Sequence, residues 1–324
     1  MPALAIYLPP GPLRAGESPT TTLELLQAET PGSLVQLNYR LSHNNPYPGP
    51  IHDVLAGYDW IRNNLLARPS DPRSRIAVFG SHIGGGLAAM LALTEGRANQ
   101  PGRITAAALR DPVLDWVGID DLSTKDGGDG YVEELLKLRD QIFTKPAQYF
   151  DPFASPMLFL RSAGKPIPPH TPSLAEMDDM EQLAVFNRAE RARMDAEAAR
   201  ADTEGAAPEQ PQTLRKTALR YPSASLGSKL PAFHLTASAT SPLRARSEEF
   251  ATRLRMAHKR QAGRVEFGRK VLSDDEIAQL DKAERAEYDA KSREAEEQVR
   301  LVRSRESADA WVKDAAVWLD RLGR

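Results

Sequence analysis

The amino-acid sequence predicts an α/β protein built on a doubly wound, mainly parallel sheet. Short apolar runs bounded by proline or glycine alternate with segments in which apolar residues recur at helical spacing. A glycine-rich turn joins one apolar run directly to an apolar helix. Strands that alternate with helices favour a parallel sheet covered on both faces. Right-handed crossovers then make the sheet doubly wound.

The expected elements follow in order along the chain. Each apolar run of strand length is bounded by turn residues, and each helical segment carries an apolar face. The strands are expected at residues 3–8, 33–41, 76–79, 104–109, 229–238 and 264–272. The helices are expected at residues 20–28, 52–66, 86–94, 247–260 and 309–322.

Two charged stretches do not fit this alternation. Residues 161–228 combine proline-rich flanks with a charged middle that has a weak apolar face, which predicts an insertion, either a lid or disordered. Residues 273–305, rich in Ala, Glu, Arg and Lys, predict a solvated helix or helix pair. The sheet domain then consists of residues 1–160 and 229–324, with the insertion between them.

Composition excludes several function classes. The 324 residues carry a formal net charge of −2 and are 41% hydrophobic, which gives no electrostatic reason to bind nucleic acid. There is no cysteine, so disulfides, thiolate nucleophiles and zinc–thiolate sites are absent. No apolar run has the roughly 18–20 residues that span a bilayer, and the amino terminus lacks a signal-peptide pattern. We therefore expect a cytoplasmic protein without a membrane span, a cofactor or a metal.

The glycine-rich turn lies in the stretch RIAVFGSHIGGGLAAMLAL. A sharp turn from strand to helix written G-x-S-x-G places a nucleophilic serine in acyl-transfer enzymes. Here the five positions are Gly80, Ser81, His82, Ile83 and Gly84. The serine stands one position early, and a histidine occupies the position of the nucleophile.

Five segments in order resemble the hormone-sensitive-lipase-like branch of the α/β-hydrolase fold. VQLNYRLSHNNPYPGPIHDVLAGYDWI is similar to the family's DYRLAPEHPFPAAVEDV block, and FGSHIGG to its GDSAGG turn. RDPVLDW, DPFASPML and LPAFHLTASATSPLRARSEEFATRL resemble the later segments, the last of which carries the family's catalytic acid. The resemblance covers about half of the chain. Because the strand predicted at residues 3–8 begins almost at the first residue of the sequence, we expect the family's upstream strands to be missing.

The resemblance also says where catalytic parts are expected, and each is altered. His82 aligns with the nucleophile, and Ser81 with a residue whose side chain points elsewhere. The oxyanion hole of the family uses an HGGG-type loop, where this chain has YLPPGPLR. Proline has no N–H, so Gly11 is the candidate donor there, with Ile83 at the turn. We predict a pocket bounded by Gly11, Ser81, His82 and Ile83.

The acid and the histidine are altered too. The resemblance places Ser241, in TSPL, where relatives have aspartate, and a serine carries no charge to stabilise an imidazolium. The catalytic histidine of the family follows the last strand, but no histidine follows His258 in this sequence. The other candidates are expected to be structural or solvated; they are His43, His52, His170 and His234.

These changes favour a catalytically degenerate hydrolase-fold protein, an interaction or assembly protein with an unknown protein partner. A second interpretation is a binder of a small apolar ligand that has kept the pocket. A third is an active carboxylic-ester hydrolase that uses a displaced Ser81 or a nucleophile not visible in the sequence. The first two predict no turnover of esters, and ligand-induced thermal stabilisation separates the second from the first.

Overall fold

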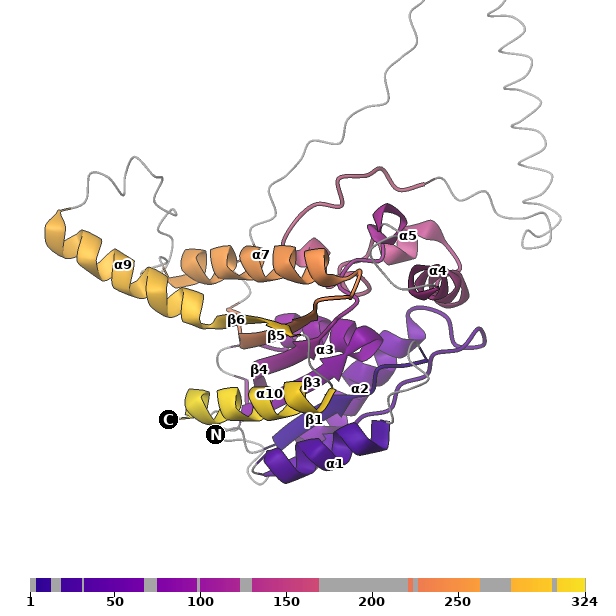
Figure 1. Ribbon diagram of the computed structural model, residues 1–324, viewed down its shortest axis with the longest axis horizontal. Helices are drawn as coiled ribbons and strands as arrows, with labels where there is room; N and C mark the ends of the chain where they lie inside the picture. Colours follow the sequence, from indigo (N-terminus) through magenta and orange to yellow (C-terminus); the bar gives the residue numbers. More distant parts are fainter. Residues whose placement is uncertain are drawn as a thin grey trace, which may run out of the picture. The chain divides into compact units, whose positions relative to one another are not determined.

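The computed structural model describes most of the chain outside the predicted insertion. The described residues are 4–12, 19–30, 32–66, 75–97, 100–122, 130–168, 221–223, 227–262, 281–304 and 308–323. Within them lies a parallel sheet of six strands in the order β2-β1-β3-β4-β5-β6 (Figure 1). The strands are β1 (Leu4–Leu8), β2 (Ser33–Gln36), β3 (Arg75–Ser81), β4 (Arg103–Arg110), β5 (Ala232–Ser238) and β6 (Val299–Ser304). The predicted fold class is confirmed.

Helices cover both faces of the sheet. The main ones are α1 (Pro19–Glu29), α2 (Gly49–Asn64), α3 (His82–Thr94), α4 (Tyr131–Ile142), α7 (Arg244–Ala262), α9 (Lys282–Glu297) and α10 (Ala308–Gly323). Shorter helical turns are η1 (Ile119–Asp121), α5 (Pro146–Tyr149) and η2 (Pro156–Phe159). Figure 1 shows α1 and α10 beside one another on one side of the strands and α3 and α7 on the other. This is the three-layer arrangement that parallel sheets need, because both of their faces are apolar.

Each face has its own hydrophobic core. The larger core joins the strands to α2, α3, α7 and α4, with Phe233 and Phe250 packed edge to face. The smaller core lies under α10, whose Trp311, Ala315 and Trp318 recur at helical spacing and are buried against β3, β4 and β5. The alternation of strand residues between the two cores fixes the register of the sheet.

The carboxyl-terminal part of the sheet differs from the sequence prediction. The strand that pairs with β5 is β6, Val299–Ser304, inside the stretch 273–305 that was predicted to be helical. Within that stretch, α9 (Lys282–Glu297) confirms the predicted helix. β6 contains Val299, Leu301 and Val302 together with Arg300 and Arg303, a mixture suited to an edge strand, but the charged composition around it hides the signal. The strand predicted at 264–272 lies outside the described residues.

The chain divides into two compact units. One comprises Met1–Pro166 with Ala218–Arg324, and the other Ile167–Thr217. The predicted insertion, 161–228, thus begins inside the first unit. Its residues 169–220 and 224–226 lie outside the described part, so its nature stays a prediction. Among the described helices, none combines the length and apolar character that a membrane crossing requires.

Candidate functional site

The turn between β3 and α3, residues Gly80–Gly84, has the backbone of a nucleophile elbow. His82 has a φ of 50°, a conformation that non-glycine residues rarely adopt. The two glycines that bracket it are required by packing. A Cβ on Gly80 would lie 2.4 Å from the carbonyl oxygen of Gly84, and a Cβ on Gly84 would lie 2.2 Å from that of Pro9. We call residues Gly80–Gly84 the elbow.

The imidazole of His82 stands at the position of the nucleophile and is closed off from solvent. Its exposed fraction is 0%. Its Nδ1 atom is hydrogen-bonded to the hydroxyl of Tyr131, at 3.0 Å, and the two rings meet nearly edge to face with centroids 6.1 Å apart. Tyr131 is the first residue of α4, so the start of α4 contacts the imidazole at the elbow.

Ser81 does not share that position. It is the last residue of β3, has an extended backbone with φ of −127° and ψ of 151°, and pairs with Arg110 of β4. Successive side chains of a strand point to opposite faces, so the hydroxyl leaves the chain in a different direction from the imidazole. Ser81 is also 3% exposed. Ser81 and His82 therefore differ in backbone conformation, extended at Ser81 and left-handed at His82.

The loop after β1 lies against the elbow. Gly11 has a φ of 76°, and a Cβ on it would lie 3.1 Å from side-chain atoms of both Ile83 and Leu41. The structure therefore brings Gly11 and Ile83 together, as expected for two candidate donors. The carbonyl oxygen of Pro9, which faces Gly84, accepts a hydrogen bond from the Tyr39 hydroxyl at 2.5 Å. Burial raises the pKa of Tyr39, so this hydroxyl keeps its proton.

A small apolar cavity adjoins the elbow. Its volume is about 30 Å³, and its lining includes Ile83, Leu87, Val113 and Trp116 but not the imidazole of His82. Pockets that bind small molecules usually hold some 300–1,000 Å³. This cavity is therefore smaller than a typical small-molecule site.

The predicted acid position, Ser241, serves the turn before α7. Its hydroxyl accepts a hydrogen bond from the backbone N–H of Leu243 at 3.3 Å, and its carbonyl accepts one from Arg244 N–H at 3.1 Å. The side chain is buried. Ser241 therefore has a local structural role in the turn.

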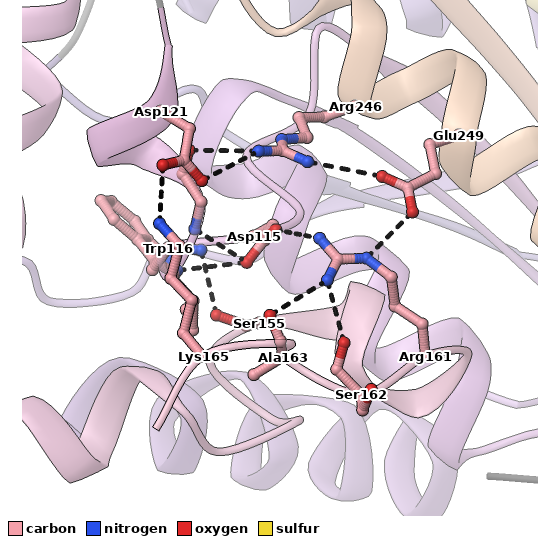
Figure 2. A network of polar contacts seen from close by, with 12 residues as sticks. Asp115, Trp116, Asp121, Ser155, Arg161, Ser162, Ala163, Lys165, Arg246 and Glu249 are labelled. Carbon is pink, nitrogen blue, oxygen red and sulfur yellow. Dashed lines mark hydrogen bonds and ion pairs between the residues drawn. The ribbon is translucent and has the colours of Figure 1, made fainter. Parts of the chain in front are cut away.

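The carboxylates near this turn are committed to cations (Figure 2). Asp115, which is buried, accepts hydrogen bonds from two backbone N–H groups and pairs with Arg161 at 2.6 Å. Arg161 also pairs with Glu249 of α7 at 3.0 Å. Arg246 and Lys165 complete the group by pairing with Asp121, and Arg246 also pairs with Glu249. We call these six side chains the charged network; it has three positive and three negative members.

Asp111 is a buried, charged residue that was not among the sequence candidates. It follows β4, has a φ of 42° and is fully buried. Its carboxylate accepts hydrogen bonds from the backbone N–H of Ser238, at 2.9 Å, and from the Ser238 hydroxyl. These bonds join the ends of β4 and β5. The sequence could have pointed to Asp111, because it stands directly before Pro112 at the end of a predicted strand. Aspartate is one of the few residues that adopt the left-handed backbone conformation.

The other described histidines belong to other segments of the fold. His43 and His52 are exposed, His258 is buried on α7, and His170 lies outside the described residues. His234 contacts Asp314 of α10 at 3.0 Å, a histidine–carboxylate pair that sequence reasoning did not find. It is buried under α10, on the sheet face away from α3. Burial lowers its pKa despite the neighbouring carboxylate.

The described residues hold no group of three or more histidine, aspartate or glutamate side chains arranged to bind a metal ion. The polar groups around the elbow are an imidazole, a phenol and a serine hydroxyl. The buried carboxylates described above accept hydrogen bonds from backbone groups, from Ser238 or from arginines. Among the described residues at the elbow, the imidazole pairs with a phenol, which differs from a carboxylate–imidazole–hydroxyl chain.

Comparison with known proteins identifies the class. A family model described as alpha/beta hydrolase fold matches residues 13–207, more than half of the chain. The chain therefore belongs to the α/β-hydrolase family, in its hormone-sensitive-lipase-like branch.

Individual relatives are more distant. Over 59 residues the chain is 41% identical to the carboxylesterase NlhH of Mycobacterium tuberculosis, a match that spans 18% of this chain and 18% of that relative. A solved α/β hydrolase enzyme from the metagenome of Lake Arreo, Spain, superposes with a TM-score of 0.55 at 15% identity, over 100% of this chain and 75% of the other. An arylesterase structure superposes with a TM-score of 0.53 at 15% identity, over 98% of this chain and 75% of the other. At such identities the structural likeness establishes the fold alone.

Proposed function

We propose that this chain is a catalytically degenerate α/β-hydrolase that acts as an interaction or assembly protein. The observation that carries the proposal is the closed elbow, in which His82 stands at the position of the nucleophile with Tyr131 against it. Acyl transfer needs a nucleophile that a substrate can reach and a base that is oriented by an acid. The elbow supplies neither.

The remaining catalytic positions support the same proposal. Ser241 is uncharged and bonded within its own turn. No histidine follows β6 in the sequence, where the family's catalytic histidine is expected. The carboxylates of the charged network already pair with arginine and lysine side chains. Restoring the chemistry would thus require changes in several separate segments.

An interaction role is favoured over the binding of a small apolar ligand at the elbow, because the adjoining cavity of about 30 Å³ is far too small for one. Helix α9 offers a suitable surface for a partner protein. It packs against α7, while Glu284, Arg285, Asp289 and Arg293 are exposed and mix both signs of charge. Such a surface favours a polar partner that complements both charges.

The second candidate is an active carboxylic-ester hydrolase that uses Ser81. The local identity to a carboxylesterase favours it. The burial of Ser81 and its place within β3 count against it.

Hydrolysis of a short-chain aryl ester separates the two candidates. We expect no turnover above background from the wild-type chain or from His82→Ser, because the single change restores neither base nor acid. Ser81→Ala is the variant that tests whether any turnover depends on the Ser81 hydroxyl. Turnover in the wild type that disappears in Ser81→Ala would establish the esterase and overturn the proposal. Turnover in His82→Ser alone would reveal a base near the elbow.

A further inference from the structure

A cleft opens at the amino ends of the central strands, at the edge of the sheet opposite the elbow. Its volume is about 170 Å³, and it is bounded by β3, β4, the chain before β5 and the last turns of α10. Arg75, Arg103 and Lys229 contribute its charged side chains. None of the described residues that line it is acidic. We call it the basic cleft.

The two arginines are neighbours by strand register. Arg75 of β3 is paired directly with Arg103 of β4. Side chains of paired residues leave the same face of a sheet, so the two guanidinium groups share the face that α10 covers. Like charges placed opposite each other on neighbouring strands are destabilising. A bound anion would remove that penalty.

The described neighbours of Arg103 disfavour its charged form. Burial, followed by the positive charge of Arg75, lowers its pKa. Both influences disfavour the charged form. A guanidinium keeps its proton even so, and it is suited to bind carboxylate or phosphate through two parallel hydrogen bonds.

The rest of the cleft is apolar apart from Thr105 and Gln298. Leu230 and Pro231 line it from the chain before β5, and Leu319 and Leu322 from α10. Leu322 is 37% exposed, so part of this apolar surface faces solvent. A cleft with basic groups and an apolar wall fits a ligand that has both an anionic and a hydrocarbon part.

We propose that the basic cleft binds a small amphipathic anion, a carboxylate or phosphate head on a short hydrocarbon group. Arg75, Arg103 and Lys229 contact the head, and the leucines of α10 and the chain before β5 surround the hydrocarbon. This site is separate from the elbow and does not depend on whether the elbow is catalytic.

Isothermal titration of the full chain with four probes tests the proposal. The probes are octyl phosphate, octanoate, inorganic phosphate and octanol. Octyl phosphate or octanoate should bind saturably, at least tenfold more tightly than inorganic phosphate, and octanol should not bind. Inorganic phosphate that binds as tightly as octyl phosphate would overturn the apolar half of the proposal. Octanol that binds as tightly as octanoate would overturn the ionic half.

Arg103→Gln locates the site, with Arg285→Gln on the exposed face of α9 as the charge-matched control. We expect Arg103→Gln to weaken binding at least tenfold and Arg285→Gln to leave it unchanged. Equal affinity in all three proteins would place the ligand elsewhere and overturn the assignment.

The melting temperature without ligand excludes a purely structural role. The carboxyl end of a helix carries partial negative charge, so the arginines could instead stabilise the end of α10. In a binding site, Arg103→Gln relieves repulsion from Arg75, and the melting temperature should stay the same or rise. A lower melting temperature together with unchanged binding would assign the arginines to α10 and contradict the proposal.

Discussion

Different forces hold the elbow and the charged network. At the elbow the constraint is steric, because the chain after β1 touches the first turn of α3 through backbone atoms. In the network the constraint is electrostatic, because buried Asp115 needs Arg161 beside it. The elbow can therefore keep its shape whichever side chain stands at position 82. The carboxylates of the network pair with arginine and lysine side chains, and none of these pairs includes a histidine.

The largest effect should come from adding a side chain at the elbow. Gly84→Val places a Cβ 2.2 Å from the carbonyl oxygen of Pro9 and 2.4 Å from that of Leu8, and backbone cannot move aside cheaply. We expect a loss of more than about 4 kcal/mol in unfolding free energy or no folded protein. Urea denaturation measures the loss.

Gly49→Ala, at the start of α2, is the control for this prediction. The nearest atom to a Cβ there is the Cβ of Asn45, at 3.8 Å, which is an ordinary contact. We expect a change within about 0.5 kcal/mol. A Gly84→Val protein as stable as Gly49→Ala would contradict the steric account of the elbow.

Breaking the charged network should have the next largest effect. Arg161→Gln leaves the Asp115 carboxylate buried without its cation, which should cost about 3 kcal/mol of unfolding free energy. Arg40→Gln, which breaks an exposed pair with Asp53, is the control and should cost less than about 1 kcal/mol. Equal losses of unfolding free energy in the two variants would show that the buried pair of Asp115 and Arg161 is no stronger than the exposed pair of Arg40 and Asp53.

A smaller effect should follow from pH on α7, the helix that carries Glu249. Burial lowers the pKa of His258 from 6.5 to about 4, with the charge of Lys229 acting the same way and the hydrogen bond to the backbone of Pro231 opposing it. The unfolded chain binds a proton that the folded chain does not. The stability that His258 contributes is therefore present above pH 6.5 and lost as the pH falls towards 4.

At pH 5 the loss from His258 should be about 2 kcal/mol relative to pH 7.5. Denaturation curves at both pH values measure it, with His258→Gln as the comparison because it cannot titrate. If the two proteins lose stability equally, His258 is not buried in its neutral form.

The sequence predicted the elbow well and the charged parts poorly, for physical reasons. The glycines of the elbow and the apolar residues of α3 carry a local signal that depends on neighbours in sequence. The contact of His82 with Tyr131 joins residues 49 apart, and that of Asp115 with Arg161 joins residues 46 apart, so neither is visible before the chain folds.

Strand register explains the remaining gaps. β6 was missed because its two arginines, Arg300 and Arg303, resemble the charged helix before it. The pairing of Arg75 with Arg103 depends on a register that shifts between Ile76 and Ala77, and no spacing along the chain encodes that shift.

We predict that no serine of this chain acts as a nucleophile towards esters. Intact-mass analysis after treatment with a fluorophosphonate tests it most directly, alongside an active serine esterase as the positive control. We expect no adduct on this chain under conditions that label the control completely. A single stoichiometric adduct on Ser81, absent from Ser81→Ala, would contradict it.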